Sequence, residues 1–258
     1  MNIWVPKEIV TKKDGNIVYI PPTKPAVVLL HAFAMDGILT WFLQVLALSR
    51  EYSVYVPDLL FFGGSITNRN ERSASFQAEF VAKGLGKLQV EKLTLVGLSY
   101  GGMVGFKMAK LYPDLVKSFV ASATVIELTE SISVDAYKRL GLSTWSDLLM
   151  PTTVEGLEMM FSVGLHKLPW IPKFIYRDFL ECSFPHELEL SCNKRNNKKQ
   201  VRDVQIGSPL QFQVMFNNRK ERNELLEELV VPDEEAMDTN YSQAIPKINL
   251  GTVTEISR

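Results

Sequence analysis

The residues best suited to chemistry form the run Gly97-Leu98-Ser99-Tyr100-Gly101-Gly102. An apolar stretch typical of a strand leads into this run, and helical spacing follows it. A serine on a sharp strand-to-helix turn is held clear of the backbone, and glycines two positions either side avoid collisions across the turn. The run therefore predicts that Ser99 is a nucleophile and that the backbone N–H of Tyr100 faces the developing oxyanion. The alternative is a structural serine in a turn.

A second candidate segment is His31-Ala32-Phe33, which ends the apolar run AVVLLH. A loop at this place can supply the other oxyanion donor, and we expect it to be the backbone N–H of Phe33. We interpret the His31 side chain as a loop histidine bonded to nearby backbone. A histidine at the end of a strand that precedes the nucleophile is badly placed to be the base.

Short apolar runs alternate with helical periodicity through the first half of the chain. We expect strands at 26–31, 52–56, 93–98 and 116–123, and helices at Ile38–Leu48, Ser75–Leu88 and Met103–Leu111. This alternation predicts the α/β class, with a mostly parallel sheet flanked by helices on both faces. Sites in such sheets form beyond the carboxyl ends of the strands.

The alternation stops after Glu127. Residues 128–181 predict amphipathic helices broken by prolines and rich in bulky side chains, which suits a helical cap. A polar stretch follows at 182–213, and helical spacing returns at 214–231. The predicted organisation is an α/β core carrying the nucleophile at 1–127, a cap at 128–231 with an atypical insertion at 182–213, and a divergent tail at 232–258 with a strand near Lys247–Leu250.

The charge balance gives no reason to expect nucleic acid as a partner. The 258 residues carry a net charge of −1, so neither nucleic acid nor an anionic membrane is favoured. The basic run Lys194–Arg202 has no interleaved aromatics, and we expect it to be a solvated loop rather than a nucleic-acid patch.

Compartment signals favour a soluble, cytoplasmic protein. Two cysteines, Cys182 and Cys192, are too few for a disulfide framework. The first residues lack the order of a signal peptide. The longest apolar region, Ala26–Ser49, is interrupted at Asp36, and neither half reaches the roughly 18 residues of a spanning helix.

Four motifs carry a resemblance to a known family: VVLLHAF, YVPDLLFFGGS, LVGLSYGGMV and KLYPDLV. Together they resemble the α/β-hydrolase superfamily, AB hydrolase-1 type, and are most similar to plant monoacylglycerol-lipase-like and carbon–carbon-bond hydrolase-like proteins. The resemblance implies an eight-stranded sheet, a helical cap, a Ser–Asp–His triad, and no cofactor or metal. It assigns Ser99 as nucleophile with Phe33 and Tyr100 as oxyanion donors, and it matches Asp58 to a loop aspartate that we interpret as structural.

The same resemblance predicts an incomplete triad. The family places its acid after the seventh strand and its histidine after the eighth, but residues 232–258 contain no histidine. The remaining base candidate is His166 in the cap, with His186 less well placed, and the acid candidates are Glu127 and Glu255. We therefore expect a truncated chain whose C-terminal strands are missing or incomplete. Residues 118–125 would then lie near an unpaired sheet edge.

An alternative or mispredicted transcript would explain these departures. It would retain non-coding sequence at 182–213 and diverge near the C-terminus. Comparing the transcript with its genomic locus tests this, because uninterrupted exons across both junctions would contradict it.

The expected function is a serine hydrolase acting on an ester or related acyl small molecule, impaired by loss of the triad acid and histidine. The bulky cap residues Trp145, Phe161, Trp170 and Phe174 favour a hydrophobic substrate. One alternative is a non-catalytic ligand-binding or regulatory protein that keeps the hydrolase fold. Another is a non-functional truncation product. A serine without a base is a poor nucleophile at neutral pH, so the missing histidine is what separates these hypotheses.

Overall fold

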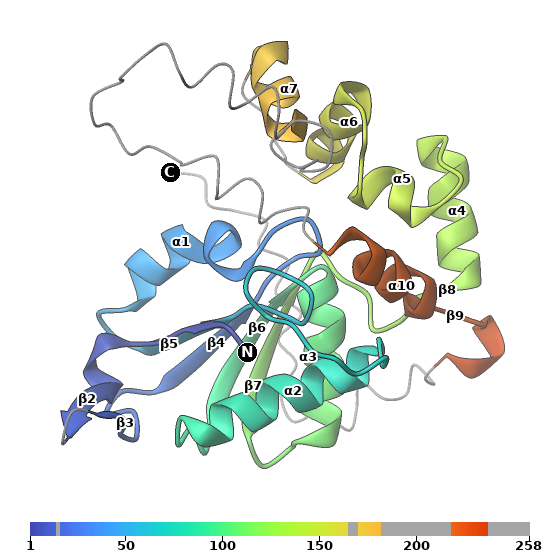
Figure 1. Ribbon diagram of the computed structural model, residues 1–258. Helices are drawn as coiled ribbons and strands as arrows, with labels where there is room; N and C mark the ends of the chain where they lie inside the picture. Colours follow the sequence, from blue (N-terminus) through green and yellow to red (C-terminus); the bar gives the residue numbers. More distant parts are fainter. Residues whose placement is uncertain (14–15, 165–169, 182–217, 237–258) are drawn as a thin grey trace, which may run out of the picture.

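A mostly parallel sheet forms the centre of the computed structural model, which describes residues 1–13, 16–164, 170–181 and 218–236 (Figure 1). Its strands are β1 (Ile3–Trp4), β4 (Ala26–Leu30), β5 (Ser53–Pro57), β6 (Leu93–Leu98) and β7 (Val116–Ser122). In space they follow the order β1-β5-β4-β6-β7. The pairs among β4, β5, β6 and β7 are parallel, and only β1 is antiparallel to its neighbour β5.

Alternate side chains of β4 face two different hydrophobic cores. Val28 and Leu30 pack in one core with α2 (Ala74–Lys87) and α3 (Tyr100–Leu111). Val27 and Leu29 pack on the opposite face with Trp41 of α1 (Gly37–Leu48). Because successive side chains of a strand point to opposite faces, this short apolar strand needs a helix layer on each side. The α/β class and the helices on both faces of the sheet are thus confirmed.

Polar side chains cap the N-termini of α1 and α2 and so define where each of these helices begins. Asp36 accepts a hydrogen bond from the backbone N–H of Leu39 (2.9 Å) at the start of α1, and Ser73 accepts one from Phe76 (3.1 Å) at the start of α2. The residue in the same position before α3 is Ser99, whose side chain makes no capping bond. Its hydroxyl is therefore not used to cap the helix.

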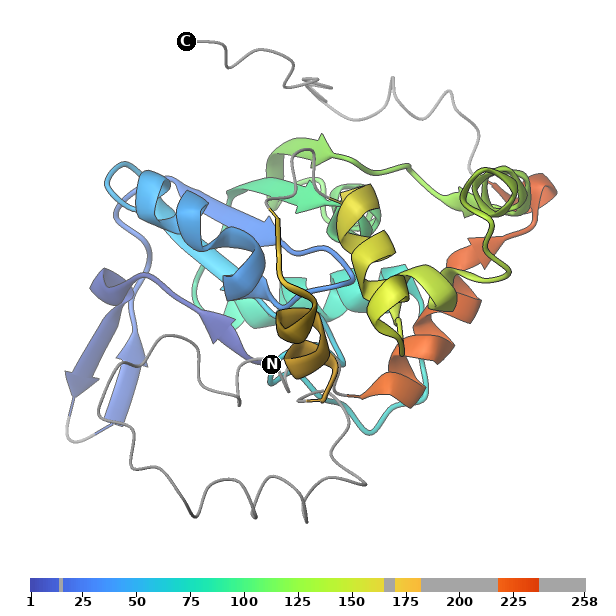
Figure 2. The same cartoon turned by 90° about the horizontal axis from the view of Figure 1, so that it is seen from above.

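A second layer of helices lies beyond the carboxyl ends of the strands (Figures 1 and 2). It consists of α4 (Glu130–Leu140), α5 (Trp145–Leu149), α6 (Val154–Gly164) and α7 (Lys173–Glu181). Its own small core, around Leu157 and Tyr176, also contacts Ala34 and Met35 in the loop after β4. These helices therefore rest on the segment that follows the first core strand.

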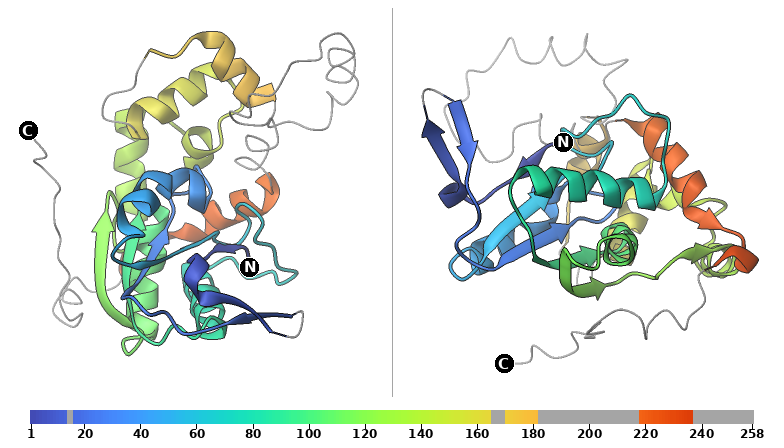
Figure 3. Two further views of the ribbon diagram at one scale, coloured as in Figure 1. Left: turned by 90° about the vertical axis from the view of Figure 1, so that its left-hand side faces the viewer. Right: turned by 90° about the horizontal axis from the view of Figure 1, so that it is seen from below.

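The helix α10 (Arg219–Leu229) lies between this helical layer and the sheet (Figure 3). The chain continues from it into β9 (Val230–Val231), which pairs in parallel with β8 (Leu128–Thr129). The remaining elements lie at the periphery: a hairpin of β2 (Val10–Lys13) and β3 (Asn16–Tyr19), and the 3-10 turns η1 (Lys7–Ile9) and η3 (Asp233–Glu235).

The predicted core strands and helices are all present, with two differences. The helix predicted over 214–231 ends at Leu229, because the next two residues pair with β8. The short strands β1, β2 and β3 were not predicted, since the hairpin residues are exposed and lack an apolar–polar alternation. Among the described residues β7 is an edge strand, as expected, and its Val120 is 37% exposed. No helix in the described ranges is long and apolar enough to span a membrane.

Two leucine-to-alanine substitutions, one in the core and one on the surface, should differ in their effect on the free energy of unfolding. Leu95 in β6 is fully buried, whereas Leu46 on α1 is 71% exposed. We expect Leu95→Ala to lower the free energy of unfolding by about 2–5 kcal/mol through lost burial and a residual cavity. Leu46→Ala should change it by no more than about 0.5 kcal/mol. Urea denaturation of both variants measures the difference, and equal effects would contradict the described core.

Candidate active site

Ser99 occupies a tight turn between β6 and α3. Its backbone has φ 52° and ψ −120°, so it lies in the left-handed region that non-glycine residues rarely adopt. Its N–H donates to the carbonyl oxygen of Ser122 at the end of β7 (2.9 Å), and its own carbonyl accepts from Gly102 (2.8 Å). The side chain is half-buried, and within the described ranges its hydroxyl has no hydrogen-bond partner. The turn thus fixes the backbone and leaves the hydroxyl uncommitted.

The glycines around Ser99 are required by close backbone contacts. A Cβ on Gly97 would come within 2.6 Å of the Gly101 carbonyl oxygen. A Cβ on Gly101 would come within 2.4 Å of the Leu30 carbonyl oxygen and 2.6 Å of that of His31. Real Cβ atoms do not approach backbone this closely, so α3 can begin against the end of β4 only with glycine at these positions.

A threonine that the sequence did not single out also holds the turn. The Thr124 hydroxyl donates to the carbonyl oxygen of Ser99 (2.7 Å), and the Thr124 side chain fills the space where a Cβ on Gly102 would lie. The preceding residue, Ala123, has φ 46°. The segment after β7 therefore supports the strand-to-helix turn of residues 97–102, the elbow, from the side away from β4. No local sequence pattern indicates Thr124, because the contact joins residues 25 positions apart.

His31 is committed to backbone hydrogen bonds. It is fully buried, its Nδ1 donates to the carbonyl oxygen of Ala32 (2.8 Å), and its Nε2 accepts from the N–H of Leu59 (2.9 Å). Burial lowers the pKa of the imidazole to about 4, although the Ala32 carbonyl and Asp58 favour the protonated form. The ring is therefore neutral near pH 7 with both nitrogens in use. This agrees with its interpretation as a loop histidine bonded to backbone.

Asp58 is likewise structural, as its match to the family suggested. Its carboxylate accepts hydrogen bonds from the backbone N–H of Gly37 (2.9 Å), the side-chain amide of Asn2 (2.6 Å) and the N–H of Gly64 (3.3 Å). A Cβ on Gly63, which has φ 50°, would lie 2.0 Å from the same carboxylate. Asp58 thus closes the loop after β5 rather than facing the elbow.

Phe33 and Tyr100, the two predicted oxyanion donors, lie together. Their rings contact each other edge to face at 5.7 Å, and both side chains are buried. Within the described part of the chain, nothing accepts a hydrogen bond from either backbone N–H. Burial also raises the pKa of the Tyr100 phenol, so its hydroxyl is a poor proton donor. The structure therefore brings the two segments together through their side chains and leaves two backbone donors free.

Of the acid and base candidates only Glu127 lies within the described residues, and no hydrogen bond joins it to Ser99 there. Glu127 forms an ion pair with Lys107 of α3, and both side chains are largely buried. His166, His186 and Glu255 lie outside the described residues, as do Cys182, Cys192, the basic run 194–202 and the predicted strand at 247–250. No cluster of potential metal ligands is present in the described ranges.

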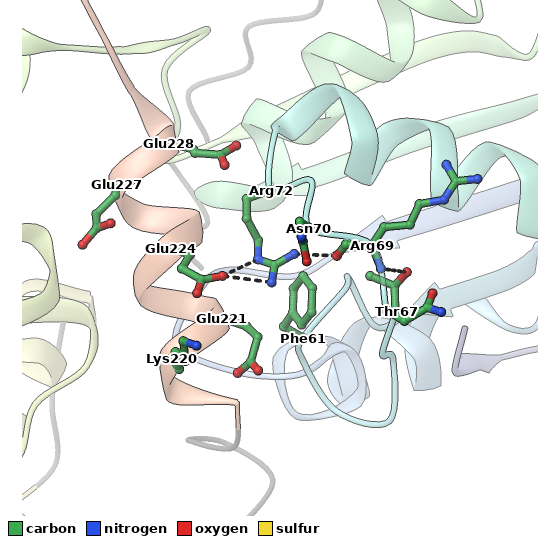
Figure 4. A pocket seen from close by; sticks show the side chains of 11 residues that line it. Phe61, Thr67, Arg69, Asn70, Arg72, Lys220, Glu221, Glu224, Glu227 and Glu228 are labelled. Carbon is green, nitrogen blue, oxygen red and sulfur yellow. Dashed lines mark hydrogen bonds and ion pairs between the residues drawn. The ribbon is translucent and has the colours of Figure 1, made fainter.

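A polar groove of about 630 Å³ lies elsewhere, between α10 and the loop before α2 (Figure 4). Arg72 crosses it to pair with Glu224 through both its Nε and Nη2 (2.9 Å each). The groove is lined by Phe61, Thr67, Asn68, Arg69, Asn70, Arg72, Lys220, Glu221, Glu224, Glu227 and Glu228. Ser99 is not among these residues, so the groove is separate from the elbow.

Comparison with known proteins agrees with this fold. Residues 25–148 match the family model described as the alpha/beta hydrolase fold. The matched residues are just under half of the chain, and together with the sheet order they show the α/β-hydrolase fold. Membership of a plant-like subgroup stays a prediction.

Two curated relatives align with part of the chain. Pimeloyl-(acyl-carrier protein) methyl ester esterase of Aeromonas hydrophila is 36% identical over 101 residues, which is 39% of this chain and 38% of that enzyme. An uncharacterized protein of Mycobacterium tuberculosis is 33% identical over 96 residues, 37% of this chain and 28% of that protein. The chain thus spans less than two fifths of each relative.

Solved structures extend the likeness in fold. The 2-hydroxy-6-oxo-6-phenylhexa-2,4-dienoate hydrolase of Rhodococcus sp. strain RHA1 has a TM-score of 0.54 at 16% identity, covering 81% of this chain and 67% of that one. A lipase-like protein of Acinetobacter baumannii AYE has a TM-score of 0.56 at 18% identity, covering 80% and 57%. At these identities the structures show a shared fold alone.

Adding one methyl group at Gly101 should lower the free energy of unfolding. Gly101→Ala would push a Cβ against two backbone carbonyls, so we expect a loss of about 3 kcal/mol in the free energy of unfolding. Gly86→Ala is the matched control. It lies in α2 with nothing within 4 Å of the added Cβ, so the same change should raise stability by about 0.5 kcal/mol. Chemical denaturation reports both, and a neutral Gly101→Ala would contradict the close approach.

The buried His31 should make stability depend on pH. The folded protein keeps the ring neutral down to about pH 4, whereas an unfolded histidine binds a proton near pH 6.5. Between these values the unfolded state holds more protons, so the free energy of unfolding falls as the pH falls, by about 3 kcal/mol over the full interval. Below about pH 4 this dependence ends.

The variant His31→Gln, with an amide oxygen that can replace the Nε2 acceptor, lacks this titration. Its deficit relative to the wild type should therefore shrink between pH 7 and pH 4.5, as measured by urea denaturation across that range. A difference that is constant with pH would show that His31 titrates normally in the folded protein.

Proposed function

We propose that this chain acts on a small-molecule ester or related acyl compound with Ser99 as the nucleophile. The observation that carries the proposal is the elbow itself. Ser99 stands in a left-handed conformation between β6 and α3, with a hydroxyl that caps no helix and bonds to no described residue. Strain of this kind at a single polar residue is typical of functional sites.

In the proposed reaction the Ser99 hydroxyl oxygen attacks the carbonyl carbon of the ester. The backbone N–H groups of Phe33 and Tyr100 stabilise the oxyanion of the tetrahedral intermediate. The bond to the alcohol oxygen then breaks, the alcohol leaves with a proton, and an acyl group stays on Ser99. Water hydrolyses this acyl-enzyme, which releases the acid and restores the serine.

The weak step is removal of the hydroxyl proton. The nitrogens of His31 are both bonded to backbone, so this histidine does not take the proton. Glu127 is paired with Lys107. We therefore propose that Ser99 reacts slowly. An oxyanion hole and substrate binding alone support a residual acceleration of about 10³–10⁴ over water in enzymes that lack their triad.

The proposed substrate is hydrophobic. The helices beyond the strand ends, which we propose to act as a cap within 128–231, contain aromatic pairs such as Phe161 with Tyr176 (6.0 Å) and Tyr137 with Trp145 (5.6 Å). Aromatic and aliphatic linings favour apolar ligands. The relative from Aeromonas hydrophila is, by its name, a methyl ester esterase, which agrees with an ester as the substrate class.

A second candidate is a protein that binds such a ligand without converting it. The same commitment of His31 and Glu127 to other partners favours this alternative. The two functions differ in whether Ser99 reacts at all.

A fluorophosphonate probe decides between them. We expect slow covalent labelling of the wild type and none of Ser99→Ala, because the probe reacts with nucleophilic serines and Ser99 has no base among the described residues. Ser122→Ala is the matched control. This exposed serine lies at the end of β7, and its backbone oxygen still accepts from Ser99 after the change. Labelling is read by intact-protein mass spectrometry, followed by hydrolysis of p-nitrophenyl esters.

Absence of labelling in a folded sample would overturn the enzymatic proposal and leave the binding protein. Labelling that persists in Ser99→Ala would show that another residue reacts with the probe.

A further inference from the structure

The loop after β5 is held to its surroundings by side chains from distant elements. His31 accepts from the N–H of Leu59, and Gln77 of α2 bonds both the N–H (2.7 Å) and the carbonyl (3.3 Å) of Leu60. The next residue, Phe61, has φ 73°. A segment tied this closely holds the side chain that follows it, Phe62, in one place.

The buried cation Arg222 of α10 makes the next contact with this loop. Its side chain is 1% exposed, and its Nε donates to the carbonyl oxygen of Phe61 (3.0 Å). Its guanidinium lies over the ring of Phe62, 4.2 Å from the centroid. A desolvated guanidinium over an aromatic face is a favourable arrangement, and the planar group can bond and stack at once.

The charges around Arg222 come from several elements. Burial, and to a lesser degree Arg219 on the same helix, lower the pKa of its guanidinium to about 9, although Asp36 and Asp58 act to raise it. His31 also faces this group and is neutral. Arg222 therefore remains a cation near pH 7, within the electrostatic influence of Asp36 at the start of α1 and Asp58 after β5.

Phe62 joins this cation to the proposed oxyanion site. Its ring lies edge-on to that of Phe33 at 5.1 Å and is tilted against that of Tyr100 at 6.0 Å. It also contacts the ring of His31 at 5.0 Å. The Phe62 ring is thus contacted by the guanidinium of Arg222 and by the rings of Phe33 and Tyr100. Phe33 and Tyr100 are the two residues whose backbone N–H groups have no described acceptor.

We propose that Arg222 is a positioning residue for the oxyanion site, acting through Phe62 on the backbone of Phe33 and Tyr100. This inference rests on the proposed function. Oxyanion donors must be placed within a few tenths of an ångström of the developing charge, so an aromatic wedge that fixes both side chains also fixes the two donors.

A second arginine at the same junction offers a matched control. Arg72 lies over the ring of Phe61 at 4.2 Å and pairs with Glu224 of α10, so it too joins the loop region to α10. It makes no described contact with Phe62. If Arg222 only anchored α10, removing Arg72 would have the same consequences.

The direct test is amide hydrogen exchange of three variants and the wild type. Arg222→Met removes the cation and keeps the side-chain length, Phe62→Leu removes the aromatic faces but keeps an apolar group, and Arg72→Met is the control. We expect exchange in the peptides that cover 31–36 and 98–104 to accelerate about tenfold or more in the first two variants. Arg72→Met should change α10 and the loop 61–72 only.

Unchanged exchange at 31–36 and 98–104 in a folded Arg222→Met or Phe62→Leu would overturn the inference. So would equal acceleration there in Arg72→Met. Phe62→Leu leaves Arg222 bonded to the Phe61 carbonyl. It therefore still tests whether the Phe62 ring holds the two segments in place if Arg222→Met does not fold.

Reactivity provides an independent readout. If Ser99 is the nucleophile, Arg222→Met should slow fluorophosphonate labelling by about 10–100-fold and lower kcat for p-nitrophenyl acetate with little change in KM, because oxyanion contacts form in the transition state. Arg72→Met should label like the wild type.

Equal labelling of Arg222→Met and a reactive wild type would overturn the positioning role and leave the proposed function standing. An unreactive wild type would instead overturn the proposed function, and the exchange experiment would still decide whether Arg222 fixes the two segments.

Discussion

The contact on which the site depends is the approach of α3 to the end of β4. Gly101 lies so close to the carbonyl oxygens of Leu30 and His31 that no side chain fits between them. This contact requires β4 and β6 to be neighbours, as their parallel pairing through Leu30 and Gly97 shows. It brings the turn at Ser99 beside the loop that carries Phe33. A sheet with another strand order would separate the two segments, however well each of them folded.

The hydrogen bonds that stabilise the loop after β4 occupy both ring nitrogens of His31, so this side chain is not available as a base. A neutral imidazole can donate from one nitrogen and accept at the other, which makes it a suitable bridge between the carbonyl of Ala32 and the N–H of Leu59. Burial makes the protonated form unfavourable, so the same environment that secures the bridge excludes an imidazolium. His31 is thus structural for a physical reason and does not supply the base that the proposed reaction needs.

Local patterns predicted much of this arrangement. The apolar runs gave the core strands, and the glycine spacing around Ser99 gave the turn, because both follow from sterics within a few residues. Contacts between distant segments were missed. Thr124 supports the turn from the segment after β7, and Arg222 lies in the strongly charged stretch RKERNELLEEL, which suggests an exposed helix. A signal was nevertheless present: Arg222 precedes Leu225, Leu226 and Leu229 by three, four and seven positions, so it belongs to the apolar face of that helix.

A cation on that apolar face needs a reason beyond stability. Burying a charge is expensive, and an apolar side chain of similar length often serves a folded protein as well or better. An arginine adds a defined orientation, since one planar group can bond the Phe61 carbonyl and lie over the Phe62 ring. These partners are 161 and 160 positions earlier in the chain. The interaction therefore fixes geometry between distant segments at the point where the rings of Phe33 and Tyr100 meet, and a flexible apolar side chain would fill the same volume without fixing it.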